Sequence, residues 1–244
     1  MPELPEVDSY RTGLAKSMKG WKISGGKSIW QRASDADFGK LKGEKVVGFG
    51  RRGKYLIIEL DLHNIIIHLR MTGRIDIVEE KTPKYTTVQI NFSNNKKMCL
   101  VDYRKFGRVW VVKDISIIVG HLGIEPLSNQ FTARKFNEML EKRTGRLKPL
   151  LLNQRFIAGI GNYLADEILF RSAIHPLRKA NTLTKEEKKI LHRSIRHIIR
   201  KSIDYGGTTF LTFRGPEVKK GDFWKKLQVF RKTGEPCPHC KKPI

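Results

Sequence analysis

Cysteine is scarce in this sequence, and the features of an exported or membrane-bound chain are missing. Three cysteines in 244 residues exclude a scaffold held by disulfides and fit a reducing compartment. No stretch approaches the roughly 18 consecutive apolar residues that span a bilayer. The opening MPELPEVDSYR lacks the basic and then apolar regions of a signal peptide. We therefore expect a cytoplasmic protein with no membrane partner.

Acidic residues are also few. Only 24 Asp and Glu stand against 48 Lys and Arg, a formal net charge of +24. An excess of this size indicates a polyanionic partner, DNA or RNA. It is uneven, since residues 1–130 carry 22 − 14 = +8 and residues 131–244 carry 26 − 10 = +16. A basic, well-solvated surface and a ribosome-associated protein are the alternatives.

The hydrophobic pattern predicts an α+β protein of more than one domain. The apolar content of 39% suffices for a packed core. From Glu6 to about Met18 the apolar residues have helical spacing, and short Val- and Ile-rich segments with turn residues between them then run to Val112. We expect a β-sandwich domain over 1–116, a linker over 117–130, a helical domain over 131–226 and a cysteine-bearing segment over 227–244. Predicted helices in the second half are 133–143, 147–153, 161–171 and 185–205, and 227–232 (LQVFRK) could form a strand.

The chain start holds a candidate nucleophile. Removal of Met1 would expose the secondary amine of Pro2 beside the carboxylate of Glu3. An α-amino group has a pKa near 7.7–8.0, so much of it is free amine at neutral pH. Such an amine attacks an aldehyde-like carbon and forms an iminium, which draws electrons. The alternative is that the chain start is frayed and inert.

A C-x-x-C pair near the end is half of a zinc ligand set. Cys237 and Cys240 could supply two of the four ligands that a tetrahedral structural zinc needs, and the sequence ends before a second pair. His239 lies between them, too close to complete the tetrahedron. Cys99 lies much earlier in the chain, in a segment with a β pattern. We therefore prefer to interpret it as a buried, apolar cysteine and not as a metal ligand.

Basic residues recur beside apolar ones at predicted strand ends. Cations can hold phosphates, and an apolar side chain can wedge into a base step. The alternative places the apolar members in the core and the cations on a solvated face. The three groups are Arg51, Arg52 and Lys54; His68, Arg70 and Met71; and Arg104, Lys105 and Phe106.

The segment Ile157–Asn162 holds two glycines in a tight double turn between predicted helices. Asn162 would be a good N-cap for the second helix, and the N–H groups of that helix start would make a phosphate site. The alternative is a helix–helix connection that needs glycine for its geometry alone.

Taken together, eight segments in order resemble formamidopyrimidine-DNA glycosylases. They are MPELPEV, RRGKYLIIEL, HLRMTG, D-x-R-K-F-G, HLGIEPL, NQRFIAGIGN, GGTTF and GEPCPHC. The resemblance implies a β-sandwich with an N-terminal helix, a helix-two-turn-helix domain and a C-terminal zinc finger. It implies excision of oxidised purines, 8-oxoguanine and formamidopyrimidines, from duplex DNA, and strand cleavage at the abasic site by β,δ-elimination. We would then expect a bacterial, nucleoid-associated monomer.

The resemblance also assigns roles to individual residues. Pro2 would be the nucleophile and Glu3 the acid–base partner, with Glu6 nearby. Lys54, which we count with the catalytic residues, would match a phosphate-binding position of the family. His68 and Asn162 would match two others. Met71, Arg104 and Phe106 would fill the gap left by the extruded nucleotide, with Arg104 facing the orphaned base. The loop that closes over the lesion would include Thr208, Thr209 and Arg214.

Departures from the family pattern keep a second hypothesis open. Structural zinc is expected in the family, but only the ligands Cys237 and Cys240 are here, and the finger-tip arginine is missing. Phe230 stands where a tyrosine is frequent. No redox cofactor is expected. The alternative function is a lesion-DNA-binding module whose catalysis is weakened by loss of half the finger.

Overall fold

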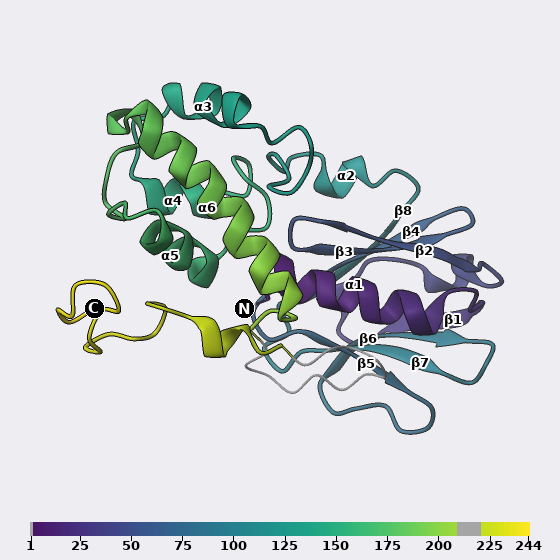
Figure 1. The fold of residues 1–244 in the computed structure, drawn as a ribbon. Helices are drawn as coiled ribbons and strands as arrows, with labels where there is room; N and C mark the ends of the chain where they lie inside the picture. Colours follow the sequence, from purple (N-terminus) through teal and green to yellow (C-terminus); the bar gives the residue numbers. More distant parts are fainter. Residues whose placement is uncertain (1, 209–220) are drawn as a thin grey trace. The chain divides into compact units, whose positions relative to one another are not determined.

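The computed structural model describes residues 2–208 and 221–244. Within them the chain forms two compact units, residues 2–121 and residues 122–208 with 221–244. The division falls inside the segment 117–130, for which a linker was predicted. Each unit has its own secondary structure, drawn in Figure 1. No helix in the described ranges is both long and apolar enough to cross a bilayer.

The first unit begins with helix α1, Leu4–Met18. Its buried face is the one that the spacing predicts: Val7, Tyr10, Leu14 and Met18 are each at most 2% exposed. The helix begins two residues before the predicted start, because Pro5 is tolerated in a first turn, where its missing N–H has no helical partner. The Tyr10 hydroxyl accepts a hydrogen bond from the Ile75 N–H at 3.1 Å, which ties α1 to the sheet.

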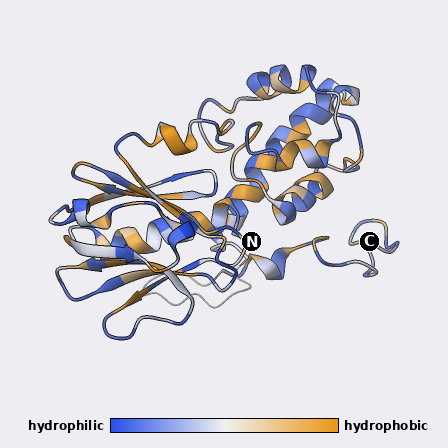
Figure 2. Ribbon diagram, turned by 180° about the vertical axis from the view of Figure 1, so that it is seen from behind, coloured by the Kyte–Doolittle hydropathy of each residue, from blue (hydrophilic) through white to orange (hydrophobic). Residues whose placement is uncertain are grey.

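Eight strands form two antiparallel four-stranded sheets, as predicted for a sandwich. One sheet has the order β1-β6-β7-β5 and the other β2-β3-β4-β8. Both views show α1 running between the two sheets (Figures 1 and 2), and one hydrophobic cluster joins residues of α1 with residues of both. The strands are β1 Ile23–Ser28, β2 Val46–Arg52, β3 Tyr55–Leu60, β4 Asn64–His68, β5 Arg74–Val78, β6 Thr86–Phe92, β7 Lys97–Val101 and β8 Arg108–Val112.

Short elements complete the first unit. The 3-10 turns η1 (Gln31–Ala33) and η2 (Phe38–Leu41) lie between β1 and β2 in the chain. Helix α2 (Ser116–Val119) follows the last strand and is one of the most apolar segments in Figure 2. Cys99 is buried in β7, as its β pattern predicted.

The second unit is helical. Its helices end within two residues of the predicted ends. Thr184 caps the longest of them, α6 (Lys185–Asp204), in a capping box: the Thr184 hydroxyl accepts from the Glu187 N–H, and the Glu187 carboxylate accepts from the Thr184 N–H. The described residues after Gly221 add a 3-10 turn, η4 (Phe223–Lys226). The elements are α3 Ala133–Glu141, α4 Leu147–Leu152, α5 Asn162–Arg171, η3 Ala180–Thr182, α6 Lys185–Asp204 and η4 Phe223–Lys226.

The strand prediction for 227–232 is wrong, and the reason is a buried carboxylate. Glu167 of α5 is 2% exposed. Its side chain accepts hydrogen bonds from the N–H groups of Gln228, Val229 and Phe230 at 2.9–3.0 Å. Three successive N–H groups therefore converge on one side chain, whereas those of a strand alternate in direction. Glu167 fixes this segment against α5.

Candidate active site and DNA-contact residues

The start of α1 holds two buried carboxylates. Glu3 and Glu6 are 2% and 4% exposed, and the Glu3 N–H donates to the Glu6 carboxylate at 2.8 Å. Pro2, the first described residue, is half-buried directly before them. Unpaired N–H groups at a helix start favour negative charge nearby, so this position suits buried acids. The structure thus places Pro2, Glu3 and Glu6 at one point of the fold.

Lys54 joins this cluster from another part of the chain. It lies in the turn between β2 and β3 and is 6% exposed. Burial lowers the pKa of the Lys54 ammonium, and the negative charges of Glu3 and Glu6 act in the opposite direction. An amine and two carboxylates therefore interact in a space with little access to water, which is typical of functional sites.

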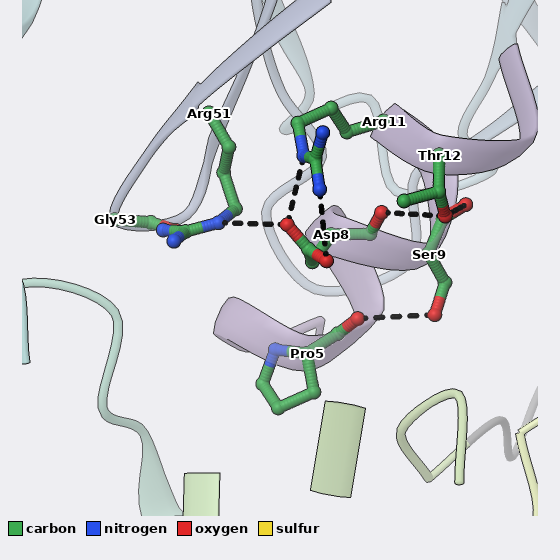
Figure 3. Close-up of polar contacts among 7 residues, drawn as sticks. All are labelled: Pro5, Asp8, Ser9, Arg11, Thr12, Arg51 and Gly53. Carbon is green, nitrogen blue, oxygen red and sulfur yellow. Dashed lines mark hydrogen bonds and ion pairs between the residues drawn. The ribbon is translucent and has the colours of Figure 1, made fainter. Parts of the chain in front are cut away.

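A chain of polar contacts fixes the turn that carries Lys54 to α1 (Figure 3). Asp8 of α1 accepts hydrogen bonds from Arg11 at 2.9 Å and from Arg51 at 3.4 Å. Arg51 also donates to the Gly53 carbonyl at 3.0 Å. Gly53 has φ +55°, which suits the first position of a two-residue type II′ hairpin turn. The helix that bears the carboxylates thus also holds the turn that bears the amine.

His68 ends strand β4 as a neutral hydrogen-bond donor. Its side chain is buried, and burial, with the positive charges of Arg70 and Lys54, lowers its pKa to about 3. Its Nδ1 accepts a hydrogen bond from the Arg70 N–H at 3.0 Å, which leaves the proton on Nε2. Tyr55 lies edge-on against the ring, with centroids 4.5 Å apart. His68 can therefore donate from Nε2 to a phosphate oxygen.

Three residues predicted to act on the base stack form one exposed cluster. Met71 and Phe106 are 43% and 48% exposed, so the alternative that places them in the core is wrong. Arg104 joins them, with Nη1 3.7 Å from the Met71 sulfur and its guanidinium 5.2 Å from the centre of the Phe106 ring. Arg70 and Lys105, the neighbours of the two apolar residues, have φ near +55° to +58°. Two strained loops thus present the cluster to solvent.

A buried carboxylate from the loop that bears Arg104 and Phe106 supports this cluster. Asp102 is fully buried and accepts hydrogen bonds from the N–H groups of Arg104 at 3.1 Å, Phe106 at 2.8 Å and Gly107 at 2.7 Å. It also accepts one from the Thr72 hydroxyl. The only signal in the sequence was its place at the head of the D-x-R-K-F-G segment.

In the second unit Asn162 is exposed at the start of α5, but it is not the N-cap. Gly161 occupies the cap position and Asn162 is the first helical residue. The preceding double turn is held by Gln154, whose amide donates to the Leu152 and Ile160 carbonyls at 2.9 and 2.8 Å and accepts from the Gly159 N–H at 2.9 Å. The Asn162 side chain is therefore spared from capping and can face a ligand.

The predicted lesion loop is only partly described. Thr208 is buried, whereas Thr209 and Arg214 lie outside the described residues. The described chain on either side of 209–220 is joined, because Asp222 donates to the Tyr205 carbonyl at 2.8 Å and Phe223 to that of Gly207 at 3.0 Å.

The C-x-x-C pair has the turn of a metal knuckle but too few ligands. The Cys237 N–H donates to the Lys242 carbonyl at 2.8 Å, and hydrogen bonds from the backbone of Cys240 and then His239 lower the pKa of the Cys237 thiol. The His239 ring packs on Phe170, with centroids 4.7 Å apart. In residues 2–208 and 221–244 no group of three His, Cys, Asp or Glu side chains could hold a metal. The two thiols do not complete a tetrahedral zinc site.

Comparisons with known proteins agree over nearly the whole chain. Residues 1–109 match the formamidopyrimidine-DNA glycosylase N-terminal domain, and residues 122–214 match the H2TH domain of the same enzymes. The chain is 40% identical over 257 residues to the formamidopyrimidine-DNA glycosylase of Protochlamydia amoebophila, covering 98% of the chain and 92% of that relative. It is 38% identical over 252 residues to that of Pelotomaculum thermopropionicum, covering 98% and 91%.

Solved structures show the same similarity. The complex of Lactococcus lactis Fpg with DNA containing an abasic site matches with a TM-score of 0.91 and 34% identity, over 99% of the chain and 93% of that protein. A mutant of the same protein bound to DNA containing Fapy-dG matches with a TM-score of 0.92 and 34% identity, over 100% and 93%.

Proposed function

Because this chain belongs to the formamidopyrimidine-DNA glycosylase family, we propose that it removes oxidised purines from duplex DNA with the amine of Pro2 as nucleophile. It is a DNA glycosylase of base-excision repair, and its partner is damaged DNA. A base in the stack is out of reach, so the nucleotide must be turned out at a cost of a few kcal/mol. Since the substrate is chromosomal DNA, we expect the protein to work in the bacterial cytoplasm at the nucleoid.

The observation that carries the proposal is the buried cluster at the chain start. Glu3 and Glu6 lie beside Pro2 at the chain start, and Lys54 comes from a separate part of the sequence to interact with them. Exclusion of water strengthens the electrostatic interactions between charges in such a site. An inert, frayed terminus would not require a buried acid next to it.

The chemistry follows from the amine. After loss of Met1, the nitrogen of Pro2 attacks C1′ of the damaged nucleotide, and the bond from C1′ to the base breaks. The base leaves with that electron pair and is protonated by solvent. Glu3 accepts the proton that the nitrogen loses and passes it to the sugar ring oxygen, so the ring opens and C1′ becomes an iminium with Pro2. The iminium acidifies the hydrogens on the adjacent carbon, and the two flanking phosphates leave in turn. Water then hydrolyses the iminium and frees the amine.

The remaining residues of the first unit would position the DNA. Met71 and Phe106 would fill the gap left by the nucleotide, which offsets part of the unstacking cost, while Arg104 faces the orphaned base. His68, held neutral with its proton on Nε2, and Lys54 would bind phosphates. Asn162 of the second unit would do the same. No step is assigned to zinc, because within the described residues the Cys237 and Cys240 thiols have no third metal-ligating side chain beside them.

The test is borohydride trapping on duplex DNA with one 8-oxoguanine. Intact-mass measurement first selects protein that has lost Met1. We expect release of the base, nicking on both sides of the site and a covalent protein–DNA adduct. Retention of lesion DNA in a gel shift, with neither nicking nor adduct, would refute the proposal in favour of the binding-only alternative.

A further inference from the structure

The second unit carries a basic groove that takes no part in the candidate site. The hollow has a volume of about 860 Å³ and lies between α6, the start of α3 and the end of α5. Its cations are Arg171, Arg193, Arg196, Arg200 and Lys201, and Asp204 is its only carboxylate. The groove thus gathers five permanent positive charges against one negative charge.

Two of its side chains form a fixed floor. Arg196 donates to the carbonyls of Pro126 and Ser128 at 3.3 and 3.2 Å. The His192 Nε2 lies 2.9 Å from the Phe131 carbonyl oxygen. Carbonyl groups are neutral, so they hold Arg196 in place without cancelling its charge.

The rim is exposed and unneutralised. Arg171, Arg193 and Arg200 are exposed, and within the described chain none of them forms an ion pair with a carboxylate. Burial together with the charges of Arg171 and Lys201 lowers the pKa of His197, which lines the same groove. Like charges are therefore crowded here, and an anion would relieve their repulsion.

The spacing of these cations suits a strand of phosphates. Arg193 and Arg200 lie on one face of α6, and their separation along the helix axis is about 10 Å. Phosphates of one DNA strand recur about every 3.4 Å along the duplex axis, so this span covers several of them. Arginine forks also match phosphate oxygens in pairs.

We propose that this groove binds the phosphate backbone of DNA, separately from the lesion site. The inference goes beyond the proposed function, because none of these residues belongs to the candidate site. The backbone can come from the same duplex outside the lesion or from a second duplex. Both sources present the same phosphate chemistry, and the experiment below distinguishes between them.

The test neutralises the two exposed rim arginines, Arg193→Gln with Arg200→Gln. The matched control is Lys185→Gln with Lys189→Gln, the same charge change on the same helix outside the groove. Binding to undamaged duplex is measured over a range of salt concentrations. Two lost phosphate contacts should reduce the slope of log K against log salt by about 1.8, whereas the control should change it much less. Both variants should keep the parent melting temperature, because the substituted residues are exposed.

Two arms identify the source of the backbone. A slope change on a long duplex but not on a short lesion duplex indicates the same duplex beyond the lesion. Loss of binding of a second duplex by protein already loaded with the short one indicates a second duplex. Equal slopes for variant and control on every duplex would overturn the proposal.

The proposed function is tested separately on the same preparations. Single-turnover excision from the short lesion duplex should be unchanged in the Arg193→Gln, Arg200→Gln variant. If the parent protein excises no base, the proposed function is refuted. The salt dependence of DNA binding still tests whether the groove binds the DNA backbone.

Discussion

The hydroxyl of Thr72 donates a hydrogen bond to the carboxylate of Asp102, 30 residues further along the chain. This contact joins the loop that presents Met71 to the loop that presents Arg104 and Phe106. Because Asp102 also accepts from three backbone N–H groups of its own loop, one buried side chain sets the arrangement of the exposed cluster.

Asp102→Asn is expected to disturb that cluster. An amide has one accepting oxygen and would place its NH₂ against buried donors, at a cost of roughly 1–3 kcal/mol. We expect excision to slow and the fluorescence of 2-aminopurine opposite the lesion to change. The control is Asp76→Asn, which removes another buried carboxylate, paired with Arg74. If both variants lose stability and activity in parallel, Asp102 has only a structural role.

Met71→Ala should separate activity from stability. Met71 is 43% exposed, so its truncation should alter the free energy of unfolding by no more than about 0.5 kcal/mol. Without the Met71 side chain in the gap, less of the free-energy cost of extruding the nucleotide is offset. Excision should therefore slow about tenfold or more. Leu62→Ala, at a position 70% exposed, is the control. Equal excision rates for the two variants would exclude a wedge role.

His68 should make the fold less stable in acid. Its pKa is lowered to about 3 from 6.5, so between these values the unfolded chain binds a proton that the folded chain does not. The stability linked to His68 is therefore complete above pH 6.5 and is lost as the pH falls toward 3. His68→Asn keeps an acceptor for the Arg70 N–H but cannot titrate. Urea unfolding from pH 4.5 to 7.5 should show a flatter dependence in the variant, and an unchanged slope would count against a neutral buried imidazole.

Glu167→Gln should release the segment 228–230 from α5. One amide oxygen cannot replace both oxygens of a carboxylate that takes three N–H groups, so roughly 1–3 kcal/mol of local stability is lost. Hydrogen exchange should accelerate at the amides of Gln228, Val229 and Phe230, while the amides of α3 exchange as before. Unchanged protection at 228–230 would show that another contact holds the segment.

Much of the fold follows from periodicity, because burial decides which residues face inward. The spacing of Val7, Tyr10, Leu14 and Met18 predicts the buried face of α1, and the Val- and Ile-rich segments predict every strand except β5 (Arg74–Val78). Two predictions from local residue preference are wrong. Local residue preference favours Asn162 as a cap and a strand at 227–232. The cap position is taken by Gly161, and the segment 228–230 is held by Glu167, about sixty residues earlier in the chain.

The candidate site divides in the same way. Motif order identified Pro2, Glu3 and Lys54, but periodicity could not show that Lys54 is buried beside the two carboxylates. Asp102 and Gln154 were missed because their partners are mostly backbone groups, and the sequence holds no residue type that signals such a partner. Supporting residues of this kind become visible only when the chain is folded.

Identifying the residue that becomes joined to the sugar tests the role of Pro2 most directly. Lys54 is the competing amine in the same cluster, because burial lowers its pKa and so favours the free amine. The borohydride-trapped adduct on 8-oxoguanine DNA is digested and mapped by tandem mass spectrometry. We predict the added mass on Pro2, in protein that has lost Met1. An adduct on Lys54, or on protein that still carries Met1, would contradict the assignment.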